Sequence, residues 1–304
     1  MSKLAKFFIV CAAVCVLGII MTFAGYAAGG MDDLEKVSDK HEWLNVGPNS
    51  TETNLVTVGE FQSIEAEGSM DIAVVAAGKN PAFEEDYPTL IESFYEDGVA
   101  GSVVISWGKG HEMPDVTNDN GVLKIKGSTD DIQNVEVNLS GEDPSPDVVV
   151  FCSDKELESI TVNGKYGDVS IAGVNVKNTS ITVEAGDIEL EGLTGSEFTA
   201  ETETGDVRAG HITSSTMSIK ANTGDINIEG CNGEISAETT NGDIEFDTKL
   251  PQDQFEISVA TNAGTISIGE VEIETENEFS LTGGPNKLTL KTDTGDIDAD
   301  FIEE

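Results

Sequence analysis

Five aspartates recur at one position of a repeated phrase and could together bind a cation. The phrase is a small or polar residue, then Gly and Asp, then Val or Ile, and its aspartates are Asp168, Asp187, Asp206, Asp225 and Asp243. Carboxylates stacked one strand spacing apart, at ~4.8 Å, must stay hydrated, share protons or bind a cation. Ca²⁺ takes about six to eight oxygen ligands, whereas each phrase supplies one Asp. The column is therefore a candidate Ca²⁺ site, and hydrated Asx turns are the simpler alternative.

The glycine of the same phrase indicates a repeated corner in the backbone. Successive glycines are 19, 19, 19, 18, 22 and 31 residues apart, and they are Gly167, Gly186, Gly205, Gly224, Gly242, Gly264 and Gly295. Gly allows positive φ at a tight corner, and Asp can bond neighbouring backbone amides there. We therefore predict that the glycines are structural turns of a repeat whose last turns contain insertions.

Apolar residues keep the register of these glycines, and their spacing predicts strands. They stand five residues before and two, four and seven residues after the glycine, as Ile181, Ile188, Leu190 and Leu193 do around Gly186. A spacing of two places side chains on one face of a strand. One such unit cannot bury its own apolar stripe, but stacked units can. The sequence thus predicts an all-β, single-stranded parallel β-helix, or β-solenoid, with turns of about 19 residues.

The charge balance and one apolar segment indicate location. The chain carries 57 acidic and 16 basic residues, so it lacks the basic surface that nucleic acid requires. Residues 7–28 contain no charge and would span ~33 Å as a helix. Lys3 and Lys6 precede this segment, which by the positive-inside rule places the C-terminal domain outside the cytoplasm. We predict a single-pass cell-membrane protein; the alternative is secretion after signal cleavage.

Changes of pattern along the chain suggest three domains. Residues 1–30 are the membrane anchor or signal segment, and residues 31–54 are a juxtamembrane stalk. The β-solenoid occupies 55–304, with an irregular part at 55–156 and regular repeats at 157–304. A helical insertion is predicted at about 81–98, with Leu90, Ile91, Phe94 and Tyr95 at helical spacing. We expect it to cover the open end of the solenoid, or alternatively to serve as a binding lid.

The residue inventory argues against catalysis. The three histidines, His41, His111 and His211, are far apart in the pattern and suggest no Ser-His-Asp arrangement. Arg208 is the only arginine, which disfavours a polysaccharide lyase that combines carboxylates, calcium and a basic residue. We predict no catalytic residues, no cofactor-binding residues and no enzyme activity; Ca²⁺ is the one cofactor considered.

The cysteines and the threonine-rich corners have simple structural interpretations. Cys11 and Cys15 fall in the apolar segment, whereas Cys152 and Cys231 are predicted to be core residues separated by about four turns and not disulfide-bonded. Pairs such as Thr202 with Thr204, Thr239 with Thr240 and Thr261 with Asn262 could present hydroxyls to a glycan. Bonding along the stacked turns is the alternative.

The order of these features resembles a known family. An apolar anchor, a strand around Asn120 to Lys126, the run ELESITVNGKYGDVSIAGV and the following TGDI units resemble the putative-adhesin, β-strand-repeat family, which includes the LiaG-like cell-envelope proteins of Gram-positive bacteria. The resemblance covers about Leu55 to Ile302 and is most specific from Leu157 to Phe246. It implies a right-handed parallel β-helix in the cell envelope and no catalytic residues.

These observations lead to one functional expectation with two alternatives. We expect a non-enzymatic, membrane-anchored, extracytoplasmic β-solenoid that is monomeric and serves as an adhesin or a cell-envelope interaction module. Its partners would be the membrane, through residues 7–28, and an envelope protein or cell-wall polymer. The alternatives are an accessory protein in envelope-stress sensing or signalling and a polysaccharide-active β-helix enzyme.

Overall fold

The computed structural model describes residues 51–77, 99–108, 112–128, 147–269, 271–273 and 278–302. The predicted membrane segment 7–28, the part of the predicted stalk before residue 51 and the predicted helical insertion at 81–98 lie outside these residues. Within the described ranges, no helix is both long enough and apolar enough to cross a membrane. The one helical element described is the short 3-10 helix η1 (Gln252–Gln254).

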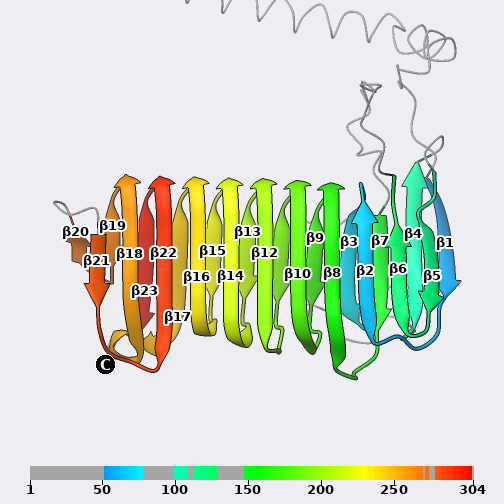
Figure 1. Cartoon of the computed structure of the whole chain (residues 1–304), viewed down its shortest axis with the longest axis horizontal. Helices are drawn as coiled ribbons and strands as arrows, with labels where there is room; N and C mark the ends of the chain where they lie inside the picture. Colours follow the sequence, from blue (N-terminus) through cyan, green and yellow to red (C-terminus); the bar gives the residue numbers. More distant parts are fainter. Residues whose placement is uncertain are drawn as a thin grey trace, which may run out of the picture. The chain divides into compact units, whose positions relative to one another are not determined.

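The described strands form two sheets, which we call sheet A and sheet B (Figure 1). In spatial order, sheet A contains β1 (Thr51–Thr57), β4 (Ser102–Gly108), β7 (Asp147–Cys152), β3 (Asp71–Ala76), β9 (Val169–Ala172), β11 (Ile188–Glu191), β13 (Val207–Gly210), β15 (Ile226–Glu229), β17 (Ile244–Pro251), β23 (Ile297–Ile302), β19 (Ile266–Ile268) and β20 (Val271–Ile273). In spatial order, sheet B contains β21 (Glu278–Leu281), β18 (Phe255–Ala263), β22 (Asn286–Thr294), β16 (Asn232–Asn241), β14 (Thr213–Thr223), β12 (Glu197–Thr204), β10 (Val176–Ala185), β8 (Leu157–Tyr166), β2 (Ser63–Gly68), β6 (Val122–Lys126) and β5 (Asp115–Asp119).

In the middle of the stack, each coil is one sheet B strand, a Gly-Asp corner and one sheet A strand. Coils β8–β9, β10–β11, β12–β13, β14–β15 and β16–β17 follow one another in sequence and in space. Their strands pair in parallel, for example Ile181 with Ala200 in sheet B and Ile188 with Val207 in sheet A. This all-β, mostly parallel architecture agrees with the predicted β-solenoid.

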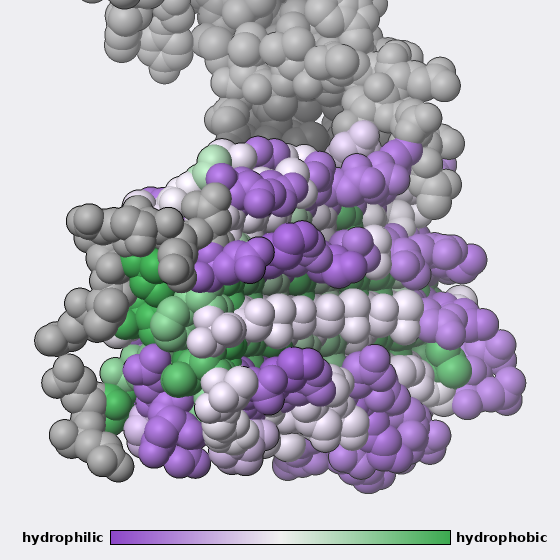
Figure 2. Space-filling model, turned by 60° about the vertical axis from the view of Figure 1, so that its left-hand side comes forward, coloured by the Kyte–Doolittle hydropathy of each residue, from purple (hydrophilic) through white to green (hydrophobic). Residues whose placement is uncertain are grey.

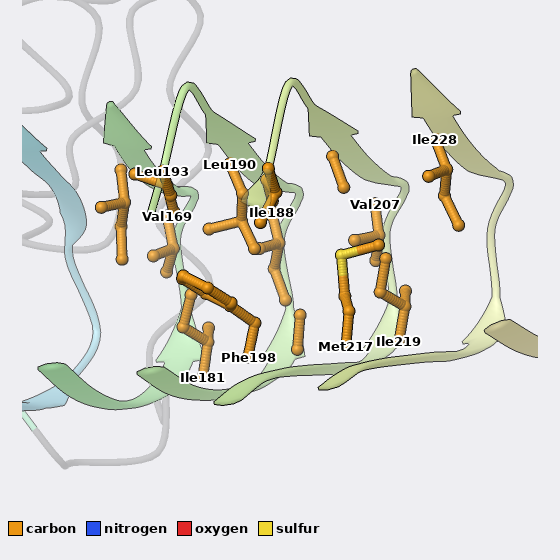
Figure 3. Close-up of a cluster of buried hydrophobic side chains, with 14 of the residues drawn as sticks. Val169, Ile181, Ile188, Leu190, Leu193, Phe198, Val207, Met217, Ile219 and Ile228 are labelled. Atoms are coloured by element: carbon orange, nitrogen blue, oxygen red, sulfur yellow. The ribbon is translucent and has the colours of Figure 1, made fainter. Parts of the chain in front are cut away.

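Side chains from both sheets meet in one core between them. The residues two and four after each corner glycine are all buried, and side chains from the two sheets face one another (Figure 3). In the column seven after, Val174, Leu193, Ile212 and Cys231 are buried, but the prediction is wrong for Ile302, which is 49% exposed. In the other coils this position follows the end of the sheet A strand, whereas Ile302 is still part of β23, where it pairs with Pro251 of β17.

Sequence order and spatial order differ at the C-terminal end. Strands β22 and β23 come last in the chain, yet β22 lies between β16 and β18, and β23 lies between β17 and β19 (Figure 1). The chain therefore forms the outermost coil, β18–β19, first and then returns to fill the place next to β16–β17. Antiparallel strands β21 and β20 then pair with the outer edges of β18 and β19.

The N-terminal end shows the same departure from chain order. The first coil, β2–β3, lies between β6–β7 and β8–β9. Antiparallel β5 pairs with β6, and antiparallel β4 pairs with β7 and in turn with β1. Strand β1 begins at Thr51, four residues inside the range assigned to a stalk, because its backbone completes this antiparallel edge.

Candidate functional site

The predicted aspartates form a continuous ladder along one corner of the stack. In each case, a carboxylate oxygen of one coil accepts the backbone N–H of the aspartate in the next coil. The donor-to-Oδ1 distances are 2.7 Å for Asp187 to Asp168, 2.7 Å for Asp206 to Asp187, 2.8 Å for Asp225 to Asp206 and 2.8 Å for Asp243 to Asp225. The parallel register of the sheets positions them, because it superimposes one corner on the next.

Two further aspartates extend the ladder, and we did not place either of them in the column from sequence. Asp71 accepts the N–H of Asp168 at 2.9 Å, so the ladder begins in coil β2–β3. Asp296 follows Asp243, to which its N–H donates at 2.7 Å, and it accepts the N–H of Thr265 at 2.7 Å. The sequence signals are the MDI at residues 70–72 and the intact TGDI at 294–297.

This geometry gives the carboxylates a structural task. One oxygen of each carboxylate accepts a backbone N–H, and the exposed side chains lie in a row and do not converge on a point. No three His, Cys, Asp or Glu side chains of the described residues are arranged to hold a metal ion. At the end of the row, hydrogen bonds from the backbone and side chain of Thr265 lower the pKa of Asp296. Calcium binding by the five aspartates stays a prediction.

The corner glycines are required by close backbone approach. Gly186, Gly205 and Gly224 have φ of 153°, 145° and 148°, a region that side-chain-bearing residues rarely adopt. A Cβ at any of these glycines would overlap the carbonyl oxygen of the corner residue in the preceding coil. Gly264 is subject to the same overlap, from Gly295. The Gly column and the Asp ladder are thus two parts of one stacked corner.

A second corner, which our sequence interpretation missed, follows the sheet A strands β9, β11, β13 and β15. Gly173, Gly192, His211 and Gly230 occupy it, with φ of 63°, 62°, 52° and 63°. In the sequence, this corner is marked by a glycine six residues after the glycine of the Gly-Asp phrase. His211 occupies that position after Gly205. His211 is exposed, and its Nδ1 lies 3.0 Å from Oε1 of Glu191 in the preceding coil. His41 and His111 lie outside the described residues.

In each pair considered for glycan binding, the first residue bonds along the stack instead, whereas Thr204 and Asn262 are exposed and Thr240 is half-buried. Thr202, Thr239 and Thr261 are buried, and each hydroxyl donates to a corner glycine carbonyl of the neighbouring coil at 3.0–3.1 Å. Thr292 does the same to Gly242. These hydroxyls are therefore already bonded to the backbone and do not reach a ligand at the surface.

The outer face of sheet B presents aligned rows of like side chains across the strands. One row consists of hydroxyl residues in continuous register, which we call the hydroxyl row: Thr161, Ser180, Thr199, Ser218, Ser236, Thr289, Ser258 and Ser280. Rows of this kind are visible as pale and purple bands along the molecule in Figure 2. A flat face with repeated hydroxyls can form many equivalent weak hydrogen bonds to an extended partner.

The neighbouring row on the same face alternates in charge. Glu201, Lys220, Glu238 and Lys291 are successive partners in the register. Lys291 Nζ lies 2.7 Å from Oε1 of Glu238; this hydrogen bond raises the pKa of Lys291 and lowers that of Glu238. Because these side chains are about half exposed, the pair stabilises the fold little.

On the outer face of sheet A, acidic residues of neighbouring strands lie directly opposite one another. Asp300 pairs with Asp247, and Asp298 pairs with Glu245. Partial burial and then the charges of Asp298 and Asp247 raise the pKa of Asp300. Such like-charge pairs across strands are destabilising.

The two described cysteines offer no reactive thiolate. Cys152 and Cys231 are buried and free, as the sequence predicted. Burial raises the pKa of both thiols to about 12. A thiol in this state is a poor nucleophile, so both residues act as small core side chains.

A family model described as Toastrack DUF4097 matches residues 101–282, more than half of the chain. The chain belongs to this family. The matched range of the Toastrack chain runs from the start of β4 to the end of β21; it includes the coils from β8–β9 to β16–β17 but not β22–β23. No curated protein matches the sequence. The narrower LiaG-like assignment stays an expectation.

Several solved structures resemble the Toastrack chain. A putative adhesin from Bacteroides fragilis shares 18% identity, with a TM-score of 0.45, over 84% of this chain and 98% of its own. A putative adhesin from Parabacteroides distasonis shares 11%, with a TM-score of 0.39, over 83% and 98%. A putative cell adhesion protein from Clostridium sporogenes shares 9%, with a TM-score of 0.36, over 84% and 100%. These low identities and TM-scores transfer neither function nor ligand to this chain.

Proposed function

We propose that this Toastrack protein is a non-enzymatic, membrane-anchored interaction module of the cell envelope. Residues 7–28 would hold it in the membrane, and the β-solenoid, expected to be right-handed, would stand outside the cytoplasm. Its outer sheet B face would bind an extended cell-wall polymer or an envelope protein. A LiaG-like adhesin or accessory role fits this proposal.

The observation that carries the proposal is the register of the sheet B face. Eight strands present the hydroxyl row without interruption, and the alternating row of Glu201, Lys220, Glu238 and Lys291 runs beside it. A catalytic centre needs a few groups converging on one reacting atom, whereas this face repeats the same groups along its length. Repetition of this kind favours weak binding to a long partner through many equivalent contacts.

The chemistry of the other described residues supports a non-enzymatic role. His211 is paired with Glu191 on an exposed corner, and the thiols of Cys152 and Cys231 are buried, with a pKa of about 12. The ladder aspartates each use one oxygen to hold the next coil. These groups are occupied by folding interactions, not positioned around a substrate.

Co-sedimentation with insoluble cell-wall sacculi tests the proposal. Detergent-solubilised full-length protein should sediment with the sacculi, and the double variant Thr199→Glu, Ser218→Glu should lose most of this binding. The matched control, Asn227→Glu with Ser267→Glu, places the same charges on the outer face of sheet A and should bind like the wild type. If neither the wild type nor the variants sediment, photo-crosslinking from position 218 in cells should capture an envelope protein; failure of both experiments refutes the proposal.

A further inference from the structure

Two rows of mostly charged side chains lie on either side of the hydroxyl row on the outer face of sheet B. Across β12, β14, β16 and β22, the alternating row consists of Glu201, Lys220, Glu238 and Lys291, and the row on the other side, which we call the flanking row, consists of Glu197, Thr216, Glu234 and Lys287. All of these side chains except Glu238 are exposed, whereas Ser218 and Ser236 between the rows are half-buried. The two outer rows are therefore the first groups that an approaching partner meets.

The sign of the charge distinguishes this face from the outer face of sheet A. On β11, β13, β15, β17 and β23, every outward charged side chain except Arg208 is acidic: Glu189, Glu191, Glu229, Glu245, Asp247, Asp298 and Asp300. Two sheet A faces would therefore repel each other. Sheet B carries both signs, so a second copy of this chain can meet it with opposite charges.

One twofold axis matches the charges of two sheet B faces. Placed between the faces, parallel to the strands and midway between β14 and β16, it lays β12 over β22 of the second copy and β14 over β16 of the second copy. Three contacts of opposite charge result, each of which occurs twice by symmetry: Glu201 with Lys291, Lys220 with Glu238, and Glu197 with Lys287. The remaining charge of the two rows, Glu234, faces Thr216 and meets no like charge there.

The ion pairs within one copy leave acids for these contacts. Lys291 and Lys287 each bond one acid of their own chain, at 2.7 Å and 3.1 Å. An ammonium group has three donors and can bond a second carboxylate. Among the residues that the structure describes, Glu201 and Glu197 form no ion pair, and these are the acids that face the two lysines of the second copy.

The same axis divides the hydroxyl row into equal halves. Thr161, Ser180, Thr199 and Ser218 lie on one side of it, and Ser236, Thr289, Ser258 and Ser280 lie on the other. Every hydroxyl of the row then faces a hydroxyl of the second copy. Because these side chains are shorter than the Glu and Lys beside them, ordered water would join them across the interface. Rows of this kind run straight along the molecule, which allows two of them to lie together (Figure 2).

Other placements of the axis are less favourable. Moved onto β14, it sets Glu201 against Glu238 and Lys220 against Lys220 of the second copy. Turned to run along the hydroxyl row, it sets Lys291 against Lys287. Moved by a whole strand spacing in either direction, it keeps fewer contacts of opposite charge and leaves part of the hydroxyl row unmatched. Charge therefore selects both the direction and the position of the axis.

The size of the face fits a weak but specific dimer. The eight strands of the hydroxyl row span ~38 Å and the three rows cover ~16 Å along the strands, which gives about 600 Å² per copy and about 1,200 Å² in total, at the lower end for specific interfaces. One contact of like charge, Glu203 with Asp293, opposes the pairing at the margin of the face. We propose that two copies of this chain pair through sheet B around this axis. The inference rests on the proposed function, in which sheet B is the interaction face, and names the chain itself as the envelope protein that binds there.

Cysteine crosslinking tests the register in the detergent-solubilised, full-length protein. Ser180 would face Ser258 of the second copy, whereas the two copies of Ser180 would lie five strand spacings apart, ~24 Å. With both cysteines of residues 7–28 changed to Ala, a mixture of the Ser180→Cys and Ser258→Cys proteins should form a dimer with a short thiol crosslinker. Each protein alone should form little, since Cys152 and Cys231 are buried, with a pKa of about 12. Equal crosslinking of either protein with itself, or no crosslinking, overturns the proposal.

An exchange of charges tests the ion pairs. Lys291→Glu in both cysteine proteins sets acids against each other, Glu201→Lys in both sets bases against each other, and either change should lower the dimer yield by about fivefold or more. Lys291→Glu in one protein and Glu201→Lys in the other restores opposite charges and should bring the yield back to within about twofold. Arg208→Glu in both makes the same charge change on sheet A and should have no effect. Circular dichroism checks that each variant is folded; an exchange that does not restore the yield contradicts the pairing.

The sacculus measurement separates this inference from the proposed function. If the exchange fails while the Thr199→Glu, Ser218→Glu variant still loses its binding to sacculi, sheet B binds a different partner; the dimer is then wrong and the proposed function stands. If the exchange restores the yield, photo-crosslinking from position 218 in cells should capture this chain itself. Capture of a different protein alone would overturn the dimer and leave the proposed function intact.

Discussion

The middle coils and the end coils of the solenoid obey different sequence rules. Coils β10–β11 to β16–β17 each carry both Gly and Asp at the corner, because each has a neighbour on both sides. At the start of the ladder, coil β2–β3 keeps Asp71 but has Met70 in place of Gly. At its far end, coil β18–β19 keeps Gly264 but has Thr265 in place of Asp.

The stacking contacts explain this difference. A corner glycine is needed where a preceding coil's carbonyl would overlap a Cβ, and an aspartate is needed where a following coil presents its N–H. On the other side of Met70, the neighbouring coil β6–β7 does not continue the Gly-Asp corner, because β6 is followed by Gly127 and Ser128. Thr265 has no following coil. Its backbone N–H and its side chain both bond Asp296 of the preceding coil. The phrase AGTI at residues 263–266, which lacks the aspartate, is therefore the sequence of an outermost coil.

The largest effect is expected from an interior corner glycine. Gly224→Ala places a Cβ against the Gly205 carbonyl at φ of 148°, and should destabilise the protein by about 3 kcal/mol or more. Gly192→Ala is the matched control, because its φ of 62° is unfavourable but no atom lies within 4 Å of the added Cβ. It should cost about 1 kcal/mol. Thermal unfolding of the full-length proteins, followed by circular dichroism, measures both; equal losses would refute the overlap argument.

The next effect separates an interior aspartate from the residue that ends the ladder. Asp225→Ala removes the acceptor of the Asp243 N–H and should cost about 1 to 2 kcal/mol, whereas Thr265→Ala keeps its backbone bond to Asp296 and should cost about 0.5 kcal/mol or less. Chemical denaturation of the two variants gives the comparison. A cost for Thr265→Ala as large as that for Asp225→Ala would mean that the end coil needs its side chain as much as an interior coil does.

The stacked corners also explain how much of the fold could be predicted from the sequence. The inward columns could be predicted because a strand has a period of two, so Ile188 and Leu190 had to share a face with Ile226 and Ile228. The return of β22–β23 to stack on β16–β17 was not predicted, because coils with the same phrase could stack on one another in more than one order. The intact TGDI at 294–297 and the incomplete AGTI before it were the usable signal. The second corner was missed because His211 breaks its glycine column.

A third comparison concerns buried threonine hydroxyls with and without a partner. Thr239→Val removes a hydroxyl that donates to the Gly224 carbonyl at 3.0 Å, and should destabilise by about 1 kcal/mol. Thr179 is equally buried, but its Oγ1 forms no hydrogen bond. Thr179→Val should be neutral or stabilising by up to about 1 kcal/mol, since the two side chains have nearly the same shape. Melting temperatures that fall equally in both variants would exclude the carbonyl bond as the cause.

The smallest effect arises where the returning coil brings acids together. Asp300 of β23 lies opposite Asp247 of β17, and partial burial, Asp298 and Asp247 raise its pKa. The folded state then binds this proton more tightly than the unfolded state, so the contribution of Asp300 to stability is present below its ordinary pKa of 3.8 and is lost as pH rises through the raised value.

Asp300→Asn should therefore raise the melting temperature at pH 7. The gain should be small, equivalent to about 0.3 kcal/mol, because exposed charges are screened. The gain should shrink as pH falls toward 3.8 and decrease in high salt. Asp253→Asn is the matched control: Asp253 is an exposed acid in η1, outside the sheet, and should change stability less. A gain that persists unchanged at low pH would mean that the returning coil is strained by packing and not by like charge.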